Sequence, residues 1–320
     1  MPEIKAISLF ILAVAASVLL LRNRRQSSGD ANDDTAGGDA GPDGKKYTIP
    51  TKIDTDLDEA DKEISEKKKK SKENSENSMK DSVKPYDRHI LVFGSGSADS
   101  WPDRIEDPSS ATSPMSRRNA LGLTTELIGL IKEHNMALKR AGKASVDVTV
   151  TCSSEPVSKN CQLGYYEAVM YPEAVVFQIA PSNLARFVEL SCHTKRNMVD
   201  MLDKSIFKAI PTPWEYLICV CAHAQRDKRC GRAGPQVIER IQAAFSAGAA
   251  GGLAAKDIKV VNTSHIGGHA FAGTLIVYPI AHWYGQVTAK GDSVEKILAE
   301  ISTGGCYENC HRGTGELVTW

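Results

Sequence analysis

The same order of elements can be read twice along this chain, and this repetition limits its fold more than any other feature. Apolar residues spaced three and four apart indicate helices, and short apolar runs bounded by turn residues indicate strands. The first copy has strand, helix, strand, hairpin and helix at 89–93, 123–138, 146–151, 168–179 and 183–190. The second copy has the same elements at 216–220, 237–245, 258–262, 274–287 and 294–301.

A Tyr-Pro pair marks the turn of each hairpin, at Tyr171-Pro172 and Tyr278-Pro279, which are equivalent places in the two copies. Strand, helix, strand, hairpin, helix is the element order of a thioredoxin-like layer. We therefore expect an α/β fold of two tandem thioredoxin-like units, the first at 85–205 and the second at 206–320.

The N-terminus is one apolar run, Ala6 to Leu21, followed by three arginines between residues 22 and 25. Its sixteen residues fall short of the roughly 20 that a spanning helix needs, but Ile4 and the snorkelling Lys5 nearly close the gap. We therefore expect residues 1–21 to be an apolar helix that anchors the chain in a membrane, with the folded part in the cytosol. A cleaved secretory signal and a mitochondrial presequence are the alternatives.

Residues 22–84 are expected to form a disordered linker. They are rich in Gly, Asp, Ser, Lys and Glu, and such a composition cannot bury enough apolar surface to offset chain entropy. Acidic residues are interspersed with the lysine run 67–70, which is typical of a solvated linker. With 39 basic and 39 acidic residues the chain has no net charge, so we expect no nucleic-acid partner.

All eight cysteines lie between Cys152 and Cys310. In a chain of this length, this number and placement of cysteines favour metal binding or redox chemistry in a reducing compartment over a disulfide scaffold. Some of these thiols, Cys192 among them, are expected to be ordinary buried side chains.

Two groups of metal-ligand residues follow two neighbouring strands of the second copy. Cys221 and Cys230 flank the loop after the strand at 216–220, and the strand at 258–262 leads into His265-Ile-Gly-Gly-His269. Loops at the carboxyl ends of neighbouring strands meet in one crevice of an open α/β sheet. The two glycines disfavour a helical zinc motif, so we expect a loop that brings both rings to one site. Thiolates and imidazoles of this kind bind iron–sulfur clusters and zinc.

These residues carry a resemblance to a known family. The segment from Cys221 to Cys230, the His-Ile-Gly-Gly-His motif and the later Trp283-Tyr284-Gly285 resemble the sucrase/ferredoxin-like family, which includes the actin-patches-distal protein and a mitochondrial relative. Asp87 to Val92 and Trp101 to Glu106 resemble that family's opening, so the similarity covers about residues 85–320.

The resemblance implies that the second unit is a thioredoxin-like ferredoxin with a 2Fe–2S cluster. Cys221 and Cys230 would bind one iron, and His265 and His269 the other. Two imidazoles in place of thiolates raise the reduction potential above that of an all-cysteine ferredoxin, as in Rieske centres. We expect a one-electron carrier, rather than an enzyme with its own substrate, whose potential falls as pH rises.

Further cysteines and histidines could compete for the metal. Cys219 shares a strand face with Cys221 and is expected to fill the core, and the family pattern gives His223 a supporting or surface role. The first unit repeats the cysteine spacing at Cys152 and Cys161 but lacks the two histidines, so we expect it to hold no cluster.

The C-terminal end contains a small group of Cys306, Cys310 and His311. A second metal site needs more ligands than these, so we expect free thiols, with a regulatory disulfide as the alternative. The terminal Trp320 resembles tails read by the cytosolic cluster-delivery machinery, which makes that machinery a possible partner beside a redox partner protein.

Two other functions remain open from the sequence. One is a zinc-stabilised binding module with the same four ligands. The other is a thiol oxidoreductase, although the usual Cys-x-x-Cys at a helix start is missing and Cys219-Val-Cys221 is the only close pair. We find no pair of carboxylates that would support glycoside hydrolysis.

Overall fold

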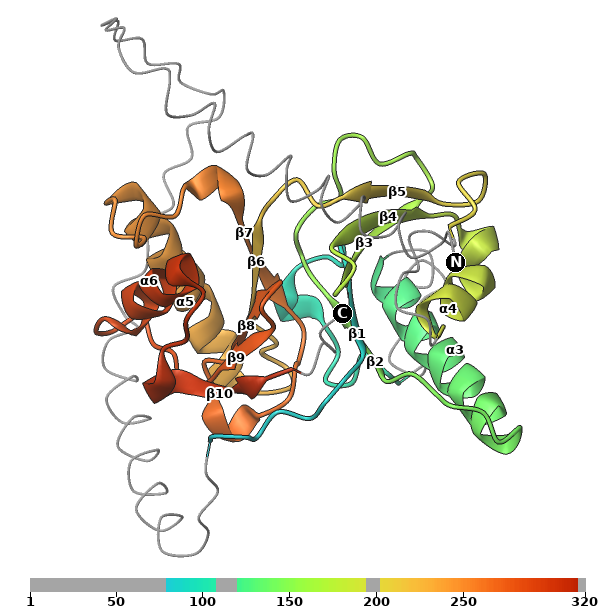
Figure 1. Cartoon of the computed structure of the whole chain (residues 1–320), viewed down its shortest axis with the longest axis horizontal. Coiled ribbons are helices and arrows are strands. Elements are labelled where there is room, and N and C mark those ends of the chain that lie inside the picture. The colour runs from blue at the N-terminus through green and yellow to red at the C-terminus, as the bar shows by residue number, and fades with distance from the viewer. Residues whose placement is uncertain (1–78, 108–119, 194–201, 316–320) are drawn as a thin grey trace, which may run out of the picture. The chain divides into compact units, whose positions relative to one another are not determined.

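The computed structural model describes residues 79–107, 120–193 and 202–315 (Figure 1). The expected anchor, nearly all of the expected linker and Trp320 lie outside the described residues. Within the described ranges, no helix combines the length and the apolar character needed to cross a bilayer.

The first sheet has five strands in the order β2-β1-β3-β4-β5. β1 pairs in parallel with β2 and antiparallel with β3, and β4 and β5 continue the sheet in antiparallel pairing. The strands are β1 (Arg88–Val92), β2 (Val148–Cys152), β3 (Tyr166–Tyr171), β4 (Val175–Ile179) and β5 (Lys208–Pro211). Helix α3 (Ala120–Arg140) connects β1 to β2, and α4 (Leu184–Ser191) follows the hairpin and contacts α3.

The second sheet repeats this order as β7-β6-β8-β9-β10, again with one parallel pair, β6 with β7. Its strands are β6 (Tyr216–Cys221), β7 (Ile258–Thr263), β8 (Leu275–Tyr278), β9 (His282–Tyr284) and β10 (His311–Thr314). Helix α5 (Lys228–Ser246) connects the parallel strands, and α6 (Ser293–Thr303) follows the hairpin. Short 3-10 helices are η1 (Ala98–Ser100), η4 (Pro181–Asn183), η6 (Ala255–Asp257), η7 (His269–Phe271) and η8 (Glu308–Cys310).

The repeated α/β order expected from the sequence is therefore confirmed as two sheets with matching strand order. Both hairpins contain a cis Tyr-Pro bond, and an alanine with positive φ follows each, Ala174 and Ala281. The sequence did not predict β5 and β10. Both are short edge strands of four residues; β5 is mostly exposed, and β10 contains Gly313, so neither carries an apolar alternation.

Alternation along each central strand divides the apolar residues between the two faces of its sheet. On β6, Ile218 and Val220 face a core that α5 and α6 cover, whereas Leu217, Cys219 and Cys221 face the first sheet. The first sheet is built likewise, with α3 and α4 on its outer core. The two sheets thus pack face to face between two layers of helices (Figure 1).

Buried polar groups join the two sheets across this shared core. The rings of Tyr171 and Tyr278 stack with their centroids 4.2 Å apart. The Tyr278 hydroxyl lies 2.7 Å from Nδ1 of His89 and 2.8 Å from the Tyr86 hydroxyl, and Nε2 of His89 lies 2.7 Å from the Thr151 hydroxyl. Such a network fixes the position of one sheet against the other, because every buried polar group needs a hydrogen-bond partner.

The folded part begins before residue 85. The Ser82 backbone N–H donates to the Arg312 carbonyl at 3.1 Å, and Val83 packs on the core between the sheets. Residues 79–84, which the sequence placed in the linker, therefore belong to the folded part.

Candidate metal centre

Cys221 and Cys230 are held at the two ends of a short loop. Cys221 is the last residue of β6, and Cys230 lies in the first turn of α5, whose start is capped by the Asp227 carboxylate, an acceptor for the Arg229 N–H. Gly234 lets the helix come close, because a Cβ there would stand 2.4 Å from the Cys221 carbonyl oxygen. This close approach places the Cys230 side chain next to Cys221.

The side chains of the two cysteines contact each other inside the core. Their exposed fractions are 0% and 1%. The Cys230 thiol holds the pKa of Cys221 well below its usual value, and the His265 ring and the His223 backbone N–H add to this effect. The same contact, together with burial, raises the pKa of Cys230. The contact therefore favours the thiolate form of Cys221 and the protonated form of Cys230.

His265 lies on a loop after β7 and His269 begins the short 3-10 helix η7, so the two rings are not carried by one α-helix, as the sequence predicted. Gly267 and Gly268 both have positive φ, 83° and 69°, which turns the chain back after β7. The two imidazole rings stack with their centroids 5.0 Å apart and an angle of 21° between their planes. Nδ1 of His265 is buried and has no hydrogen-bond partner among the described residues.

Burial falls from the cysteines to the histidines. Both thiols are buried, His265 is half-buried and His269 is exposed. The imidazole end of the group therefore meets solvent, and the sulfur end lies in apolar surroundings.

His223 supports His265 through both ring nitrogens. Nε2 lies 2.8 Å from the Pro102 carbonyl oxygen, to which it donates, and Nδ1 accepts the His265 backbone N–H at 3.2 Å. Burial lowers the pKa of His223, so the ring is neutral. With both nitrogens engaged, His223 is better placed to orient the His265 loop than to bind a metal.

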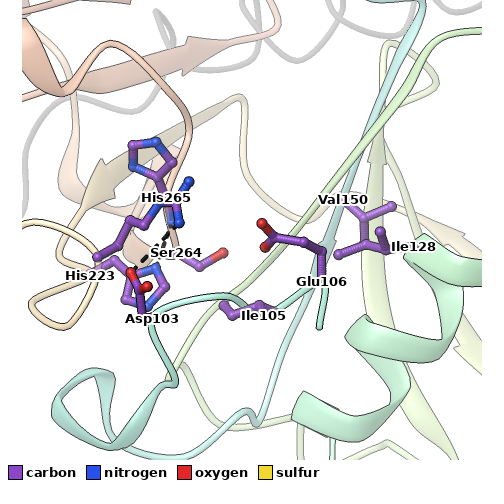
Figure 2. A pocket seen from close by; sticks show the side chains of 9 residues that line it. Asp103, Ile105, Glu106, Ile128, Val150, His223, Ser264 and His265 are labelled. Carbon is purple, nitrogen blue, oxygen red and sulfur yellow. Dashed lines mark hydrogen bonds and ion pairs between the residues drawn. The ribbon is translucent and has the colours of Figure 1, made fainter. Parts of the chain in front are cut away.

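A small pocket opens beside His265 where the two halves of the folded part meet (Figure 2). Its volume is about 70 Å³, and its lining includes Asp103, Glu106, His223, Ser264 and His265. The Glu106 carboxylate points towards Ser264 in Figure 2, and Asp103 pairs with Arg226 at 3.6 Å. The half-buried face of His265 is thus reachable by solvent through a polar opening.

Sequence reasoning missed Arg312, a buried cation at this site. Its guanidinium donates to Ser82 and lies over the rings of Phe271 and Trp283 at 5.6 and 5.5 Å. Burial lowers its pKa, while its charge interacts favourably with Cys230. Arg312 comes from β10, which has no strand signature, so nothing in the sequence connected it with the cysteine loop.

The family model described as sucrase/ferredoxin-like matches residues 79–313. The chain belongs to the sucrase/ferredoxin-like family. A Debaryomyces hansenii relative named altered inheritance of mitochondria protein 32 is 38% identical over 235 residues, covering 70% of this chain and 80% of its own. The Candida glabrata protein of the same name is 25% identical over 284 residues, covering 74% and 80%.

A solved thioredoxin-like [2Fe-2S] ferredoxin from Aquifex aeolicus aligns with 33% of this chain and 99% of its own. The identity is 16% and the TM-score 0.26, a likeness too low to support an argument about this sucrase/ferredoxin-like chain.

The other cysteines of this family member lie apart from the site or serve the core. Cys219 is fully buried between the sheets, and burial raises its pKa, as expected for a core thiol. Cys152 ends β2 and is buried, which raises its pKa to about 12, while Cys161 is half-buried and its thiol points to the Tyr165 carbonyl at 3.7 Å.

One group of three ligand residues in the described ranges has all its ligand atoms within 4.8 Å of one another. It consists of His282, Cys306 and His311, and the four residues predicted from the sequence do not form such a group. Cys306 was expected to be a free thiol near Cys310 and His311, and the structure adds His282 to its surroundings.

Proposed function

We propose that this protein is a one-electron carrier that holds a 2Fe–2S cluster through Cys221, Cys230, His265 and His269. One observation carries the proposal. The Cys221 sulfur meets both the Cys230 thiol and the His265 ring, and the latter stacks on His269, so two loops bring two sulfurs and two imidazoles together. The strand order of the second sheet, β7-β6-β8-β9, supports a thioredoxin-like ferredoxin unit.

The side chains fit such a group chemically. Thiolates and neutral imidazoles are the ligand forms of an iron–sulfur site. The contact with Cys230 already favours the thiolate form of Cys221, which is the form that binds iron. The buried Nδ1 of His265, which has no protein partner among the described residues, offers a lone pair.

A bound 2Fe–2S cluster supplies reversible one-electron exchange. Two neutral imidazoles leave the site less negative than four thiolates would, which raises the reduction potential. His269 is exposed to solvent, and His265 lines the adjoining pocket. Uptake of a proton by an imidazole ligand on reduction would make the potential fall as pH rises.

The deciding experiment is anaerobic purification of the full chain, followed by iron and sulfide analysis and electron paramagnetic resonance. We expect two irons and two sulfides per chain and a paramagnetic signal only after reduction. Cys230→Ser should remove the iron, whereas Cys161→Ser, which changes a half-buried thiol outside the site, should keep it. A chain that binds no iron after anaerobic reconstitution would overturn the proposal.

Histidine ligation is tested by the potential. His265→Cys should keep a cluster and lower its potential by on the order of 100 mV, because a thiolate replaces a neutral ring. Voltammetry of the wild-type protein between about pH 6 and 9 should give a falling potential. A potential that does not change with pH would contradict the proton coupling, but it would not contradict the presence of the cluster.

A zinc-stabilised module is the alternative for the same residues. A single tetrahedral zinc needs all four ligand atoms within about 4 Å of one another, and the four described residues do not meet even a 4.8 Å criterion. This favours a pair of metal ions. A colourless protein with one zinc and no iron would favour the module instead.

A thiol oxidoreductase is the other alternative, and the low pKa of Cys221 beside Cys230 speaks for it. Against it, both sulfurs are buried, so neither can reach the disulfide of another protein. Reduction of insulin disulfides by the metal-free protein would support this function.

We further propose partners and a location. The electron donor and acceptor are expected to be proteins, and Trp320 is proposed to bind the cluster-delivery machinery; deletion of Trp320 without loss of iron in cells would contradict this. The names of the relatives refer to inheritance of mitochondria, which favours the mitochondrial alternative over a cytosol-facing membrane anchor at residues 6–21. Cell fractionation with and without residues 1–25 distinguishes the two locations.

A further inference from the structure

A second group of metal-ligand residues lies on the outer face of the second sheet. His282 begins β9, and His311 begins the neighbouring edge strand β10. Cys306 lies in the connection between α6 and η8, which leads into β10. Three segments that are separate in the sequence thus converge at the edge of the sheet.

This group is distinct from the cysteine–histidine site of the proposed function. On β9, Trp283 belongs to the core between the sheets, whereas Tyr284 belongs to the core under α5 and α6. His282 and Tyr284 share a face, because they are two residues apart on a strand. Cys306 packs on the same outer core. The group therefore lies on the side of the sheet opposite to Cys221.

The geometry of the group is that of a single metal ion. The ligand atoms of His282, Cys306 and His311 all lie within 4.8 Å of one another, and the two ring centroids are 5.0 Å apart. The rings cross at 64°, so they do not stack, and their nitrogens can point to one place. Small side-chain rotations bring such atoms to the spacing of about 3.5 Å found around zinc.

Two of these ring nitrogens are buried without a partner. Nδ1 of His282 and Nε2 of His311 have no hydrogen bond within the described part of the chain. A buried polar atom without a partner is unfavourable, so two such atoms in neighbouring rings indicate that something absent from the protein chain binds them. Burial lowers the pKa of both rings, and a neutral imidazole is the ligand form.

We propose that His282, Cys306 and His311 form a binding site for a borderline-soft divalent metal ion, with Zn²⁺ as the ion that best matches one thiolate and two imidazoles. Three protein ligands leave one position of a tetrahedron for water. The Cys306 thiol now donates to Oε1 of Glu308 at 3.1 Å. When the metal binds, the sulfur would lose this proton to solvent, and the Glu308 carboxylate would remain beside the site.

A metal bound at this site would stabilise the edge of the second sheet. β10 is only four residues long, pairs with β9 at three of them and contains a register shift between His311 and Gly313. A metal bound by His282 on β9, His311 on β10 and Cys306 on the preceding loop would hold these three segments together. We therefore expect bound zinc to raise the melting temperature of the protein.

The test is a titration of the purified full chain, stripped with a chelator under anaerobic conditions, with Co²⁺ as a coloured probe. We expect a thiolate-to-cobalt absorption band that Zn²⁺ abolishes. Cys306→Ser should remove the part of the band that comes from this site, and His311→Gln should weaken or remove that part. The matched controls Cys161→Ser and His134→Gln change one half-buried cysteine and one half-buried histidine elsewhere, and they should leave the band unchanged.

A second variant separates this site from the first. Cys230→Ser should retain the Cys306-dependent band, because its cysteine lies on the other face of the sheet. A band that survives Cys306→Ser and disappears in Cys230→Ser would overturn the proposal. So would a wild-type melting temperature that does not change when zinc is added, since this measurement does not depend on the folding of any variant.

Discussion

The guanidinium of Arg312 lies against the backbone of Gly268, so that a Cβ on Gly268 would stand 2.2 Å from Nη2 of Arg312. The glycine belongs to the His-Gly-Gly-His loop, and the arginine comes from the last strand of the second sheet. The contact explains why the loop needs glycine at this position for two reasons, a positive φ and the absence of a side chain.

Gly268→Ala should therefore destabilise the protein more than Gly267→Ala. Both glycines have positive φ, so each alanine carries the backbone strain of about 1 kcal/mol. Only the alanine at 268 also meets Arg312, whereas a Cβ at 267 has nothing within 4 Å. We expect an additional loss of about 1–3 kcal/mol from the overpacked contact. Urea unfolding of both variants measures the difference, and equal losses would show that the Arg312 contact is unimportant.

His223→Phe should loosen the His265 loop. The variant loses the bond to the Pro102 carbonyl and leaves the His265 N–H without its acceptor, which we expect to lower the free energy of unfolding by about 2 kcal/mol. If His223 acts by positioning, iron content should fall only partly and the paramagnetic signal should broaden. Complete loss of iron, as in Cys230→Ser, would instead make His223 a ligand.

His89 should make the protein acid-sensitive. Burial lowers the pKa of His89 from 6.5 to about 3. Below pH 6.5 the unfolded chain binds a proton on this ring that the folded protein does not bind until about pH 3. The contribution of the neutral His89 ring to the free energy of unfolding is therefore fully present above pH 6.5. Between pH 6.5 and about pH 3 this contribution falls by about 1.4 kcal/mol per pH unit as the pH drops. His89→Gln should reduce this slope in urea unfolding at pH 7, 6 and 5; a slope equal to that of the wild type would contradict the prediction.

Cys219→Ala tests whether this thiol competes for the metal. The side chain is buried in the core between the sheets, so its truncation should reduce the free energy of unfolding by about 1 kcal/mol. Iron and sulfide content should remain that of the wild type. Loss of iron in a variant that still folds, as judged by circular dichroism, would make Cys219 a ligand.

The sequence predicted the central strands, the hairpins and most of the long helices because their signals are local, although α5 begins at Lys228 and not near the expected residue 237. The alternation on β6 separates Cys219 and Cys221 from Ile218 and Val220, and the two glycines of the 265–269 loop exclude a helix there. The convergence of the two loops was also predictable, because it follows from the neighbouring positions of β6 and β7 in one sheet.

The sequence could not predict the contributions of β10. Arg312 and His311 acquire their roles from the pairing of β10 with β9, which depends on the register of two short strands and not on any local pattern. His282 is likewise an ordinary strand residue until His311 and Cys306 are placed beside it. Contacts of this kind arise only from the assembled fold.

The hydrogen bond between Ser82 and Arg312 joins residues 230 positions apart. Arg312 follows both the cysteine loop and the His-Gly-Gly-His loop in the sequence, so the ribosome makes it after both. Each loop therefore exists before the buried cation that lies against Gly268. If metal insertion required the finished shape of this site, it would have to follow the synthesis and docking of β10.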